Sequence, residues 1–256
     1  MNEHIDMKIS GSSSMPGGEY GSVSISGAGK VNGSLKCEEL HCSGAAKVQG
    51  DVDCAGELHT SGAAKVFGSA RCGSLSSSGA FSAQSVQVEG LASVSGSLRT
   101  ERALTADELS ASGSLEAGSI HCRAFHASGS CRVSGDLEAE TAVLSGAAEI
   151  DGLLNAETVE ISANRAVRIH AIGGGSIHIL QKDTAVILGL FRTTPGRARI
   201  GSIEGDDIEL ENVEADIVRG KYVRIGHGCR IGTVEYGENL EAEPGTVSRS
   251  TQTGAK

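Results

Sequence analysis

Large aromatic side chains and prolines are scarce in this sequence of 256 residues. Tryptophan is absent, aromatic residues make up 3% of the chain, and proline occurs three times. A wide core built on aromatic rings is therefore excluded. A collagen-like chain is excluded too, because the 36 glycines follow no Gly-X-Y period. With 39% hydrophobic residues, the composition fits either a loose low-complexity chain or a narrow core of small aliphatic side chains.

Long apolar runs and an excess of positive charge are also missing. The longest apolar run, about residues 185–191, is far too short to span a bilayer. The net charge of −10 argues against a general nucleic-acid binder. The first residues carry no basic stretch followed by an apolar one, so no export signal is expected. The odd number of cysteines then predicts reduced thiols in a cytoplasm: Cys37, Cys42, Cys54, Cys72, Cys122, Cys131 and Cys229.

An internal repeat organises the chain between residues 26 and 162. Ser-Gly recurs at a nearly constant step, and Ser162 continues the series without its glycine: Ser26, Ser43, Ser61, Ser78, Ser95, Ser112, Ser128 and Ser145. This period is too short for helical or leucine-rich repeats. Short segments such as 34–37 and 51–54 alternate polar and apolar residues, as half-buried strands do. We therefore predict an all-β fold, a single-stranded parallel β-helix (solenoid) with about 17 residues and three short faces per coil.

Stacked coils place equivalent side chains in columns about 4.8 Å apart. Inward columns are predicted for cysteine, leucine and valine: Cys37, Cys54 and Cys72; Leu40, Leu58 and Leu75; Val31, Val48 and Val66. Outward columns of alternating charge are predicted at Lys36, Asp53 and Arg71; Glu204, Lys221 and Glu238; Asp207, Arg224 and Glu241. Glycine is expected at the corners, where it supplies a positive φ.

One predicted outward column carries a single sign of charge. Lys30, Lys47 and Lys65 follow one another at the period of the repeat. The column is either a solvated stripe or a contact with an anionic surface or partner.

The pattern divides the chain into five segments. We expect a flexible N-terminal tail at 1–19, regular coils at 20–162, irregular coils or an insertion at 163–200, C-terminal coils at 201–243 and a flexible tail at 244–256. Turn signals at 172–175 and 193–196 flank strand candidates at 177–180 and 184–191. The spacing of Ile200, Ile217 and Val234 predicts that regular coils resume there. Two stacked subdomains are the alternative to one continuous solenoid.

Candidate chemical motifs favour structural roles. Adjacent residues of a strand point to opposite faces, so His41-Cys42 and His121-Cys122 predict core thiols rather than a zinc site. His227 lies in 225–232, which resembles two hexapeptide units of a left-handed acyltransferase β-helix, and we expect it at an outward or corner position. The seven acids of 204–216 predict a solvated, paired face, and 173–175 lacks the residues of a phosphate loop. No catalytic, cofactor-binding or metal-binding residue is predicted, and the chain is not expected to be an enzyme.

Two segments resemble the bactofilin family of bacterial polymer-forming cytoskeletal proteins, most closely its longer Firmicutes-type members. The first is Gly17-Gly18-Glu19-Tyr20, followed by Val23, Ile25, Gly27 and Val31-Asn32-Gly33. The second runs from Ile203 to Asn212, followed by Val218-Arg219-Gly220, Ile225-Gly226-His227-Gly228-Cys229 and Val234-Glu235-Tyr236. The resemblance implies a right-handed β-helix that polymerises without nucleotide. It also implies a cytoplasmic scaffold, often near the inner face of the membrane, with no catalytic residues.

The sequence thus predicts a structural scaffold that assembles end to end into filaments. A solenoid ends in strand edges whose unpaired backbone groups invite further stacking. The expected partner is a second copy of the chain, and no nucleic acid is expected. The resemblance implies three further partners: a related bactofilin, envelope or motility proteins, and the membrane surface through peripheral contact. One alternative is a hexapeptide acyltransferase, whose period of six does not divide 17. Another is an extracellular polysaccharide-binding or lyase β-helix, which normally carries an export signal and clusters of aromatic or Asp and Arg residues.

Overall fold

A computed structural model describes residues 5–162, 166–181 and 197–253. These residues contain strands and turns and no helix. The chain forms two compact units, residues 1–125 and 126–256.

The N-terminal unit consists of short strands with β16 at its end: β1 (Met7–Ile9), β2 (Ser12–Glu19), β3 (Ser22–Ile25), β4 (Ala28–Cys37), β5 (Glu39–Cys42), β6 (Ala45–Val48), β7 (Val52–Thr60), β8 (Ala63–Val66), β9 (Ser69–Ser77), β10 (Ala80–Ala83), β11 (Ser85–Val88), β12 (Leu91–Val94), β13 (Ser97–Thr100), β14 (Ala103–Ala111), β15 (Ser114–Ala117) and β16 (Ser119–Ala127).

The C-terminal unit has longer strands, several of which continue around a corner: β17 (Ser130–Val133), β18 (Leu137–Leu144), β19 (Ala147–Ser162), β20 (Val167–Leu180), β21 (Ala198–Leu210), β22 (Val213–Ile225), β23 (Arg230–Ala242) and β24 (Val247–Gln252).

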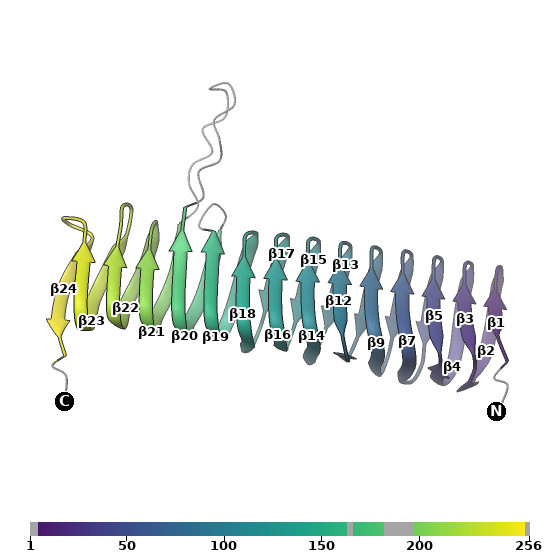
Figure 1. Cartoon of the computed structure of the whole chain (residues 1–256). Helices are drawn as coiled ribbons and strands as arrows, with labels where there is room; N and C mark the ends of the chain where they lie inside the picture. The colour runs from purple at the N-terminus through teal and green to yellow at the C-terminus, as the bar shows by residue number, and fades with distance from the viewer. Residues whose placement is uncertain (1–4, 163–165, 182–196, 254–256) are drawn as a thin grey trace, which may run out of the picture. The chain divides into compact units, whose positions relative to one another are not determined.

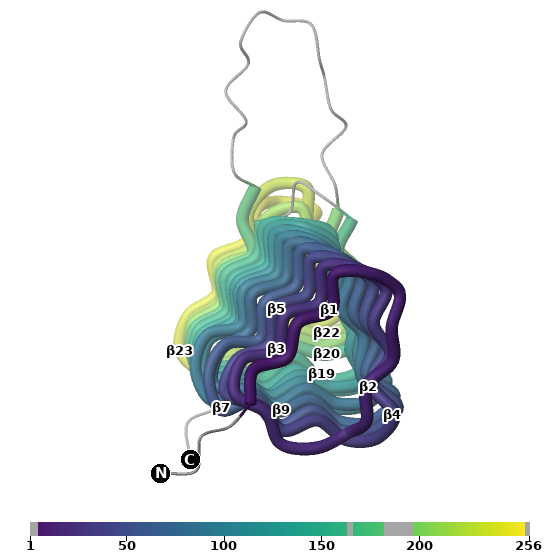
Figure 2. Tube along the Cα trace, turned by 90° about the vertical axis from the view of Figure 1, so that its right-hand side faces the viewer, coloured from purple at the N-terminus to yellow at the C-terminus, as the bar shows by residue number. Residues whose placement is uncertain are grey.

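The strands pair in parallel with equivalent strands of neighbouring coils, as Figure 1 shows. On one face of the N-terminal unit, Ala28 pairs with Ala45, and Ala45 pairs with Ala63. Each coil therefore returns to the same face after one period of the sequence repeat. Seen end on, the successive coils of this unit follow nearly the same path (Figure 2). The predicted parallel β-solenoid is confirmed, and so is the predicted length of its coils.

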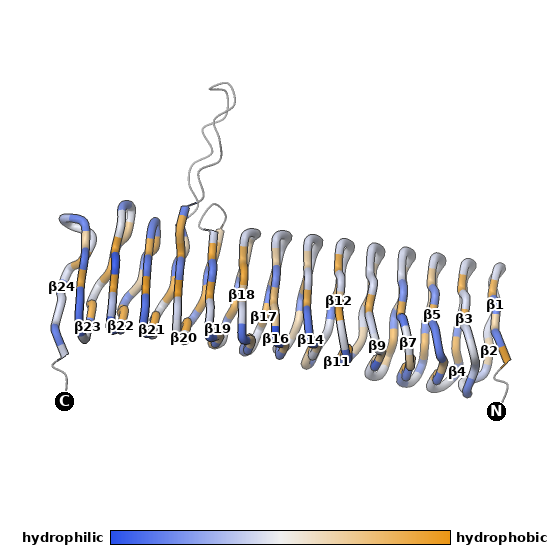
Figure 3. Tube along the Cα trace, viewed as in Figure 1, coloured by the Kyte–Doolittle hydropathy of each residue, from blue (hydrophilic) through white to orange (hydrophobic). Residues whose placement is uncertain are grey.

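The interior is a set of columns, one side chain from each coil. The predicted cysteine column is in register, because Cys37 pairs with Cys54 and Cys54 with Cys72. The leucine and valine columns are also confirmed, and all of these side chains are buried. Hydrophilic and hydrophobic residues alternate along the strands in short steps (Figure 3). Small aliphatic side chains thus fill a narrow core, as the composition predicts.

The Ser-Gly corners correct one expectation. Their glycines do not have a positive φ, which among glycines occurs only at Gly18, Gly33, Gly228 and Gly245 of the described residues. Glycine is needed there because adjacent coils approach closely. A Cβ on Gly79 would lie 1.9 Å from the carbonyl oxygen of Gly62.

The expected tails are wrong where the structure describes them. Residues 7–9 and 12–19 form β1 and β2, which pair with β3 and β4, and 247–252 form β24, which pairs with β23. Their polar composition suggested disorder, but Ile9 and Met15 are buried as core residues of the first coil.

The middle of the chain differs in part from its prediction. Residues 167–180 form one regular strand, β20, so the glycines at 173–175 are strand residues rather than a turn. Val167 pairs with Ala198, a step nearly twice the usual period, because extra residues separate these two coils. The strand candidate at 184–191 and the turn signal at 193–196 lie outside the described residues. The next described strand, β21, begins at Ala198.

Several coil steps in the C-terminal unit are shorter than 17 residues, and three predicted columns are changed as a result. Glu204 pairs in register with Arg219 rather than with Lys221, so this step is two positions shorter than predicted. Arg224 lies between Glu209 and Glu241, so its predicted partner Asp207 is wrong and Glu241 is right. The predicted column of Ile200, Ile217 and Val234 is wrong as well, because Ile200 pairs with Ala215 and Val218 with Val234.

Candidate functional site: open strand edges and a polar ladder

The N-terminal unit begins with an open strand edge. β1 pairs with β3 and β2 pairs with β4, and no described strand lies on their other side. Ile5, whose carbonyl oxygen accepts from the Gly21 N–H, has a side chain that is 74% exposed at this edge. Pro16 removes one backbone donor from β2, as prolines at sheet edges do. The remaining backbone groups can pair with another strand.

The C-terminal unit ends in a second open edge. β24 pairs with β23 through residues 247–252, and among the described residues it has no other partner. The N–H of Thr253 donates to the carbonyl oxygen of Tyr236 at 2.9 Å. The backbone N–H groups of every second residue in a strand point to the same neighbouring strand. The N–H of Thr251 therefore also points to β23, and the N–H groups of Ser250 and Gln252 point away from it.

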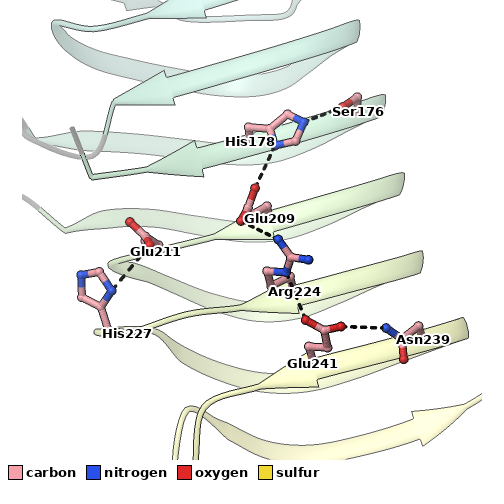
Figure 4. Close-up of polar contacts among 8 residues, drawn as sticks. All are labelled: Ser176, His178, Glu209, Glu211, Arg224, His227, Asn239 and Glu241. Atoms are coloured by element: carbon pink, nitrogen blue, oxygen red, sulfur yellow. Dashed lines mark hydrogen bonds and ion pairs between the residues drawn. The ribbon is translucent and has the colours of Figure 1, made fainter. Parts of the chain in front are cut away.

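A ladder of polar side chains crosses the coils that lead to this edge (Figure 4). His178 Nδ1 lies 3.4 Å from Glu209 Oε2, and Arg224 donates to Glu209 at 3.2 Å and to Glu241 at 3.2 Å. These hydrogen bonds raise the pKa of Arg224. Asn239 extends the ladder by donating to Glu241. Each rung from His178 to Glu241 joins neighbouring coils, so the ladder holds their register.

Part of the ladder has the connectivity of a nucleophile, a base and an orienting acid. Ser176 Oγ lies 2.8 Å from His178 Nε2, and His178 contacts Glu209 on its other nitrogen. Acyl transfer also needs donors for an oxyanion. Here the strand of Ser176 is paired on both sides, with β19 and β21, so its backbone N–H groups are committed to the sheet. Asp207, the register partner of Ser176, would repel an oxyanion. The contact between His178 and Glu209 joins neighbouring coils, and the paired strand leaves no backbone donor free beside Ser176 for an oxyanion.

Sequence reasoning missed Ser176, His178 and Glu209 as a group. The Ser-x-His spacing alone places both side chains on one face of β20, whereas Glu209 follows His178 only after a much longer step. The intervening insertion hides this neighbour from any analysis of spacing.

The structure places the predicted histidine and cysteine pairs as expected for a strand. Cys42 and Cys122 are buried and their neighbours His41 and His121 are not. His227 is exposed between β22 and β23, 3.6 Å from Glu211. Within residues 5–162, 166–181 and 197–253, no three His, Cys, Asp or Glu side chains converge as a metal site would require.

All seven cysteines are free and buried. Burial raises the pKa of Cys72, Cys122 and Cys131 to about 12. Thiols with such a pKa are protonated at neutral pH and are poor nucleophiles, so these cysteines act as core residues.

Comparisons with known proteins find two relatives in Bacillus subtilis (strain 168), both described as uncharacterized. YhbF is 41% identical over 76 residues, which are 30% of this chain and 30% of YhbF. YhbE is 48% identical over 54 residues, 21% of this chain and 22% of YhbE. The chain thus matches less than a third of either relative's length. No family model and no solved structure matches it. In the described part of the chain, no helix is long and apolar enough to cross a membrane.

Proposed function

We propose that this protein is a structural scaffold that assembles end to end into filaments without nucleotide, as its resemblance to the bactofilins implies. The observation that carries the proposal is the open backbone edge at each end of the described coils, at β1 and β2 and at β24. Edges of this kind template the pairing of another chain.

The interior of the fold supports a structural role. Its columns consist mainly of aliphatic side chains and buried thiols, and several surface cations pair with acids of neighbouring coils, as Arg71 does with Glu89 and Arg219 with Glu235. The alternative of a hexapeptide acyltransferase has less support, because the coil steps from Ala28 to Ala45 and from Glu204 to Arg219 are not multiples of six.

The test is electron microscopy and sedimentation of the purified full chain without nucleotide, where filaments are expected. Ser250→Pro removes an N–H that points away from β23 and leaves the pairing of β24 with β23 in place. Because β24 is one strand of six residues, a proline ring near its centre removes one of its few outward donors and obstructs an approaching strand, whereas the N-terminal edge keeps the outward donors of two strands beside Pro16. Filaments need both ends, whether contacts are head to tail or alternate between like ends. The variant should therefore form dimers at most.

Ser250→Ala keeps the backbone donor and is the matched control, which should form filaments like the unmodified chain. A chain that stays monomeric across salt and pH would contradict the proposal. So would a Ser250→Pro variant that still forms filaments.

A further inference from the structure

Three lysines form an uninterrupted line of positive charge on the N-terminal unit. Lys30 on β4, Lys47 on β6 and Lys65 on β8 are register partners on successive coils, so their backbones lie about 4.8 Å apart. All three are exposed, and none makes an ion pair with a residue that the structure describes.

Other cations of this unit are arranged differently. Four of them contact an acid from a neighbouring coil, at distances of 2.8 to 3.4 Å: Lys36 with Glu19, Arg71 with Glu89, Arg99 with Glu116 and Arg123 with Asp107. Like charges directly opposite each other on adjacent strands are destabilising. The lysine column therefore lacks the cross-coil pairing that the unit uses elsewhere, which suggests that an external anion balances it.

The rows beside the lysines leave them accessible. The outward residues before them are the small, exposed Ala28, Ala45 and Ala63, and those after them are Asn32, Gln49 and Phe67. None of these six side chains is acidic. The Phe67 side chain is 41% exposed, and Lys65 Nζ lies 4.8 Å from the centre of its ring. We call these three rows the lysine face.

We propose that the lysine face docks on the surface of an anionic phospholipid bilayer. Its rows lie on one face of a parallel sheet, and lysines are hydrated point charges that attract anionic headgroups without a specific geometry. Phe67 adds an aromatic ring of the kind that enters the interfacial region.

Other partners fit the lysine face less well. A second copy of the chain would need a matching column of acids on three successive coils. The described strands β20 to β23 have no such column among their register partners; Glu204, for example, is followed by Arg219 and then by Glu235. A nucleic acid that stacks its bases on aromatic side chains would find one exposed ring, Phe67, on the lysine face.

The test is flotation with vesicles of equal parts phosphatidylglycerol and phosphatidylcholine, compared with pure phosphatidylcholine, at 0.1 M NaCl. The Ser250→Pro background keeps binding separate from assembly. Binding to the anionic vesicles alone is expected, with weaker binding as salt rises. Changing Lys30, Lys47 and Lys65 together to Gln should weaken it on the order of a hundredfold, at about fivefold per lysine.

A matched control changes net charge equally elsewhere. Arg102, Arg230 and Arg249 make no ion pair with described residues, and changing all three to Gln should leave vesicle binding close to that of the parent. A second variant, Lys47→Glu, makes the column alternate in charge. It should raise the midpoint of urea unfolding at low salt while it lowers vesicle binding, which separates lost binding from lost folding.

Three results would overturn the proposal. The first is no binding of the parent to anionic vesicles, and the second is equal binding by the triple Gln variant. The third is that duplex DNA binds more tightly than the vesicles through the same lysines, which would assign a nucleic acid to the lysine face. None of these results bears on filament formation.

Discussion

The change Gly79→Ala tests whether close contact between coils, rather than backbone conformation, fixes the glycine of the Ser-Gly corner. An alanine Cβ at this position would lie 1.9 Å from the carbonyl oxygen of Gly62 and 2.6 Å from that of Ser61. To reach an ordinary contact of about 3.4 Å, the two coils must separate locally by about 1.5 Å. Both are held on their other sides by further coils, so the movement cannot spread freely.

The cost follows from the hydrogen bonds at this corner. The N–H groups of Ser78 and Gly79 donate to Thr60, and that of Ala80 donates to Gly62, at 2.8 to 3.1 Å. A shift of about 1.5 Å would break two or three of these bonds, each worth about 1 kcal/mol. Overpacking adds about 1–3 kcal/mol. We expect Gly79→Ala to lower the free energy of unfolding by about 3–6 kcal/mol.

Urea unfolding followed by circular dichroism measures this loss. Gly90→Ala is the control, because its Cβ would lie 3.3 Å from the carbonyl oxygen of Gly73 and neither glycine has a positive φ. The control should lose less than about 1 kcal/mol. If Gly79→Ala were as stable as Gly90→Ala, the reasoning from close approach would be refuted.

Two further predictions concern titration and the polar ladder. Burial raises the pKa of the Cys131 thiol from 9.0 to about 12, so the folded chain holds this proton more tightly than the unfolded one. This contribution to stability is complete below pH 9 and is lost as the pH rises towards 12. Cys131→Val should therefore reduce the fall in the free energy of unfolding at alkaline pH. An unchanged fall would contradict the raised pKa of Cys131. Arg224→Gln removes the rung between Glu209 and Glu241 and should lower the urea midpoint at low salt but not at 1 M NaCl, whereas Arg249→Gln, at a residue with no ion pair among the described ones, should change neither.

The fold could be predicted because the sequence repeat places similar apolar side chains in buried columns, one side chain from each coil. Cys37, Cys54 and Cys72 follow one another at the period of the coil, and a one-residue slip would turn each of them outward. Register in the N-terminal unit is therefore strongly specified by the sequence. The bactofilin resemblance was not needed for this part of the prediction.

The C-terminal columns could not be predicted as well, because corners there change length. Glu204 is followed one coil later by Arg219 and then by Glu235, and both steps are shorter than the period of the Ser-Gly repeat. Corner length depends on how successive coils pack. Local alternation fits the longer step equally well, so the sequence offered Lys221 as the partner of Glu204, whereas Lys221 contacts Asp206 at 2.9 Å.

The role of the corner glycines was hidden for a related reason. Sequence reasoning assigns glycine to positive φ because that property is local. A Cβ added at Gly79 would clash with Gly62, which belongs to the preceding coil. This close approach can be recognised only once the coils are stacked.

Candidate sites in this fold are defined by register more than by motifs. A side chain that recurs once per coil becomes a line on the surface, as Lys30, Lys47 and Lys65 do, although a full coil of sequence separates each from the next. The same rule joins His178 to Glu209 across an insertion. Because a column repeats along an assembly, each added copy would also repeat its lysine face. Weak binding by one copy would then become strong by multivalency, without any new contact within the copy. Assembly through strand edges and attachment through a lateral face are therefore compatible, because they use different surfaces of the coil.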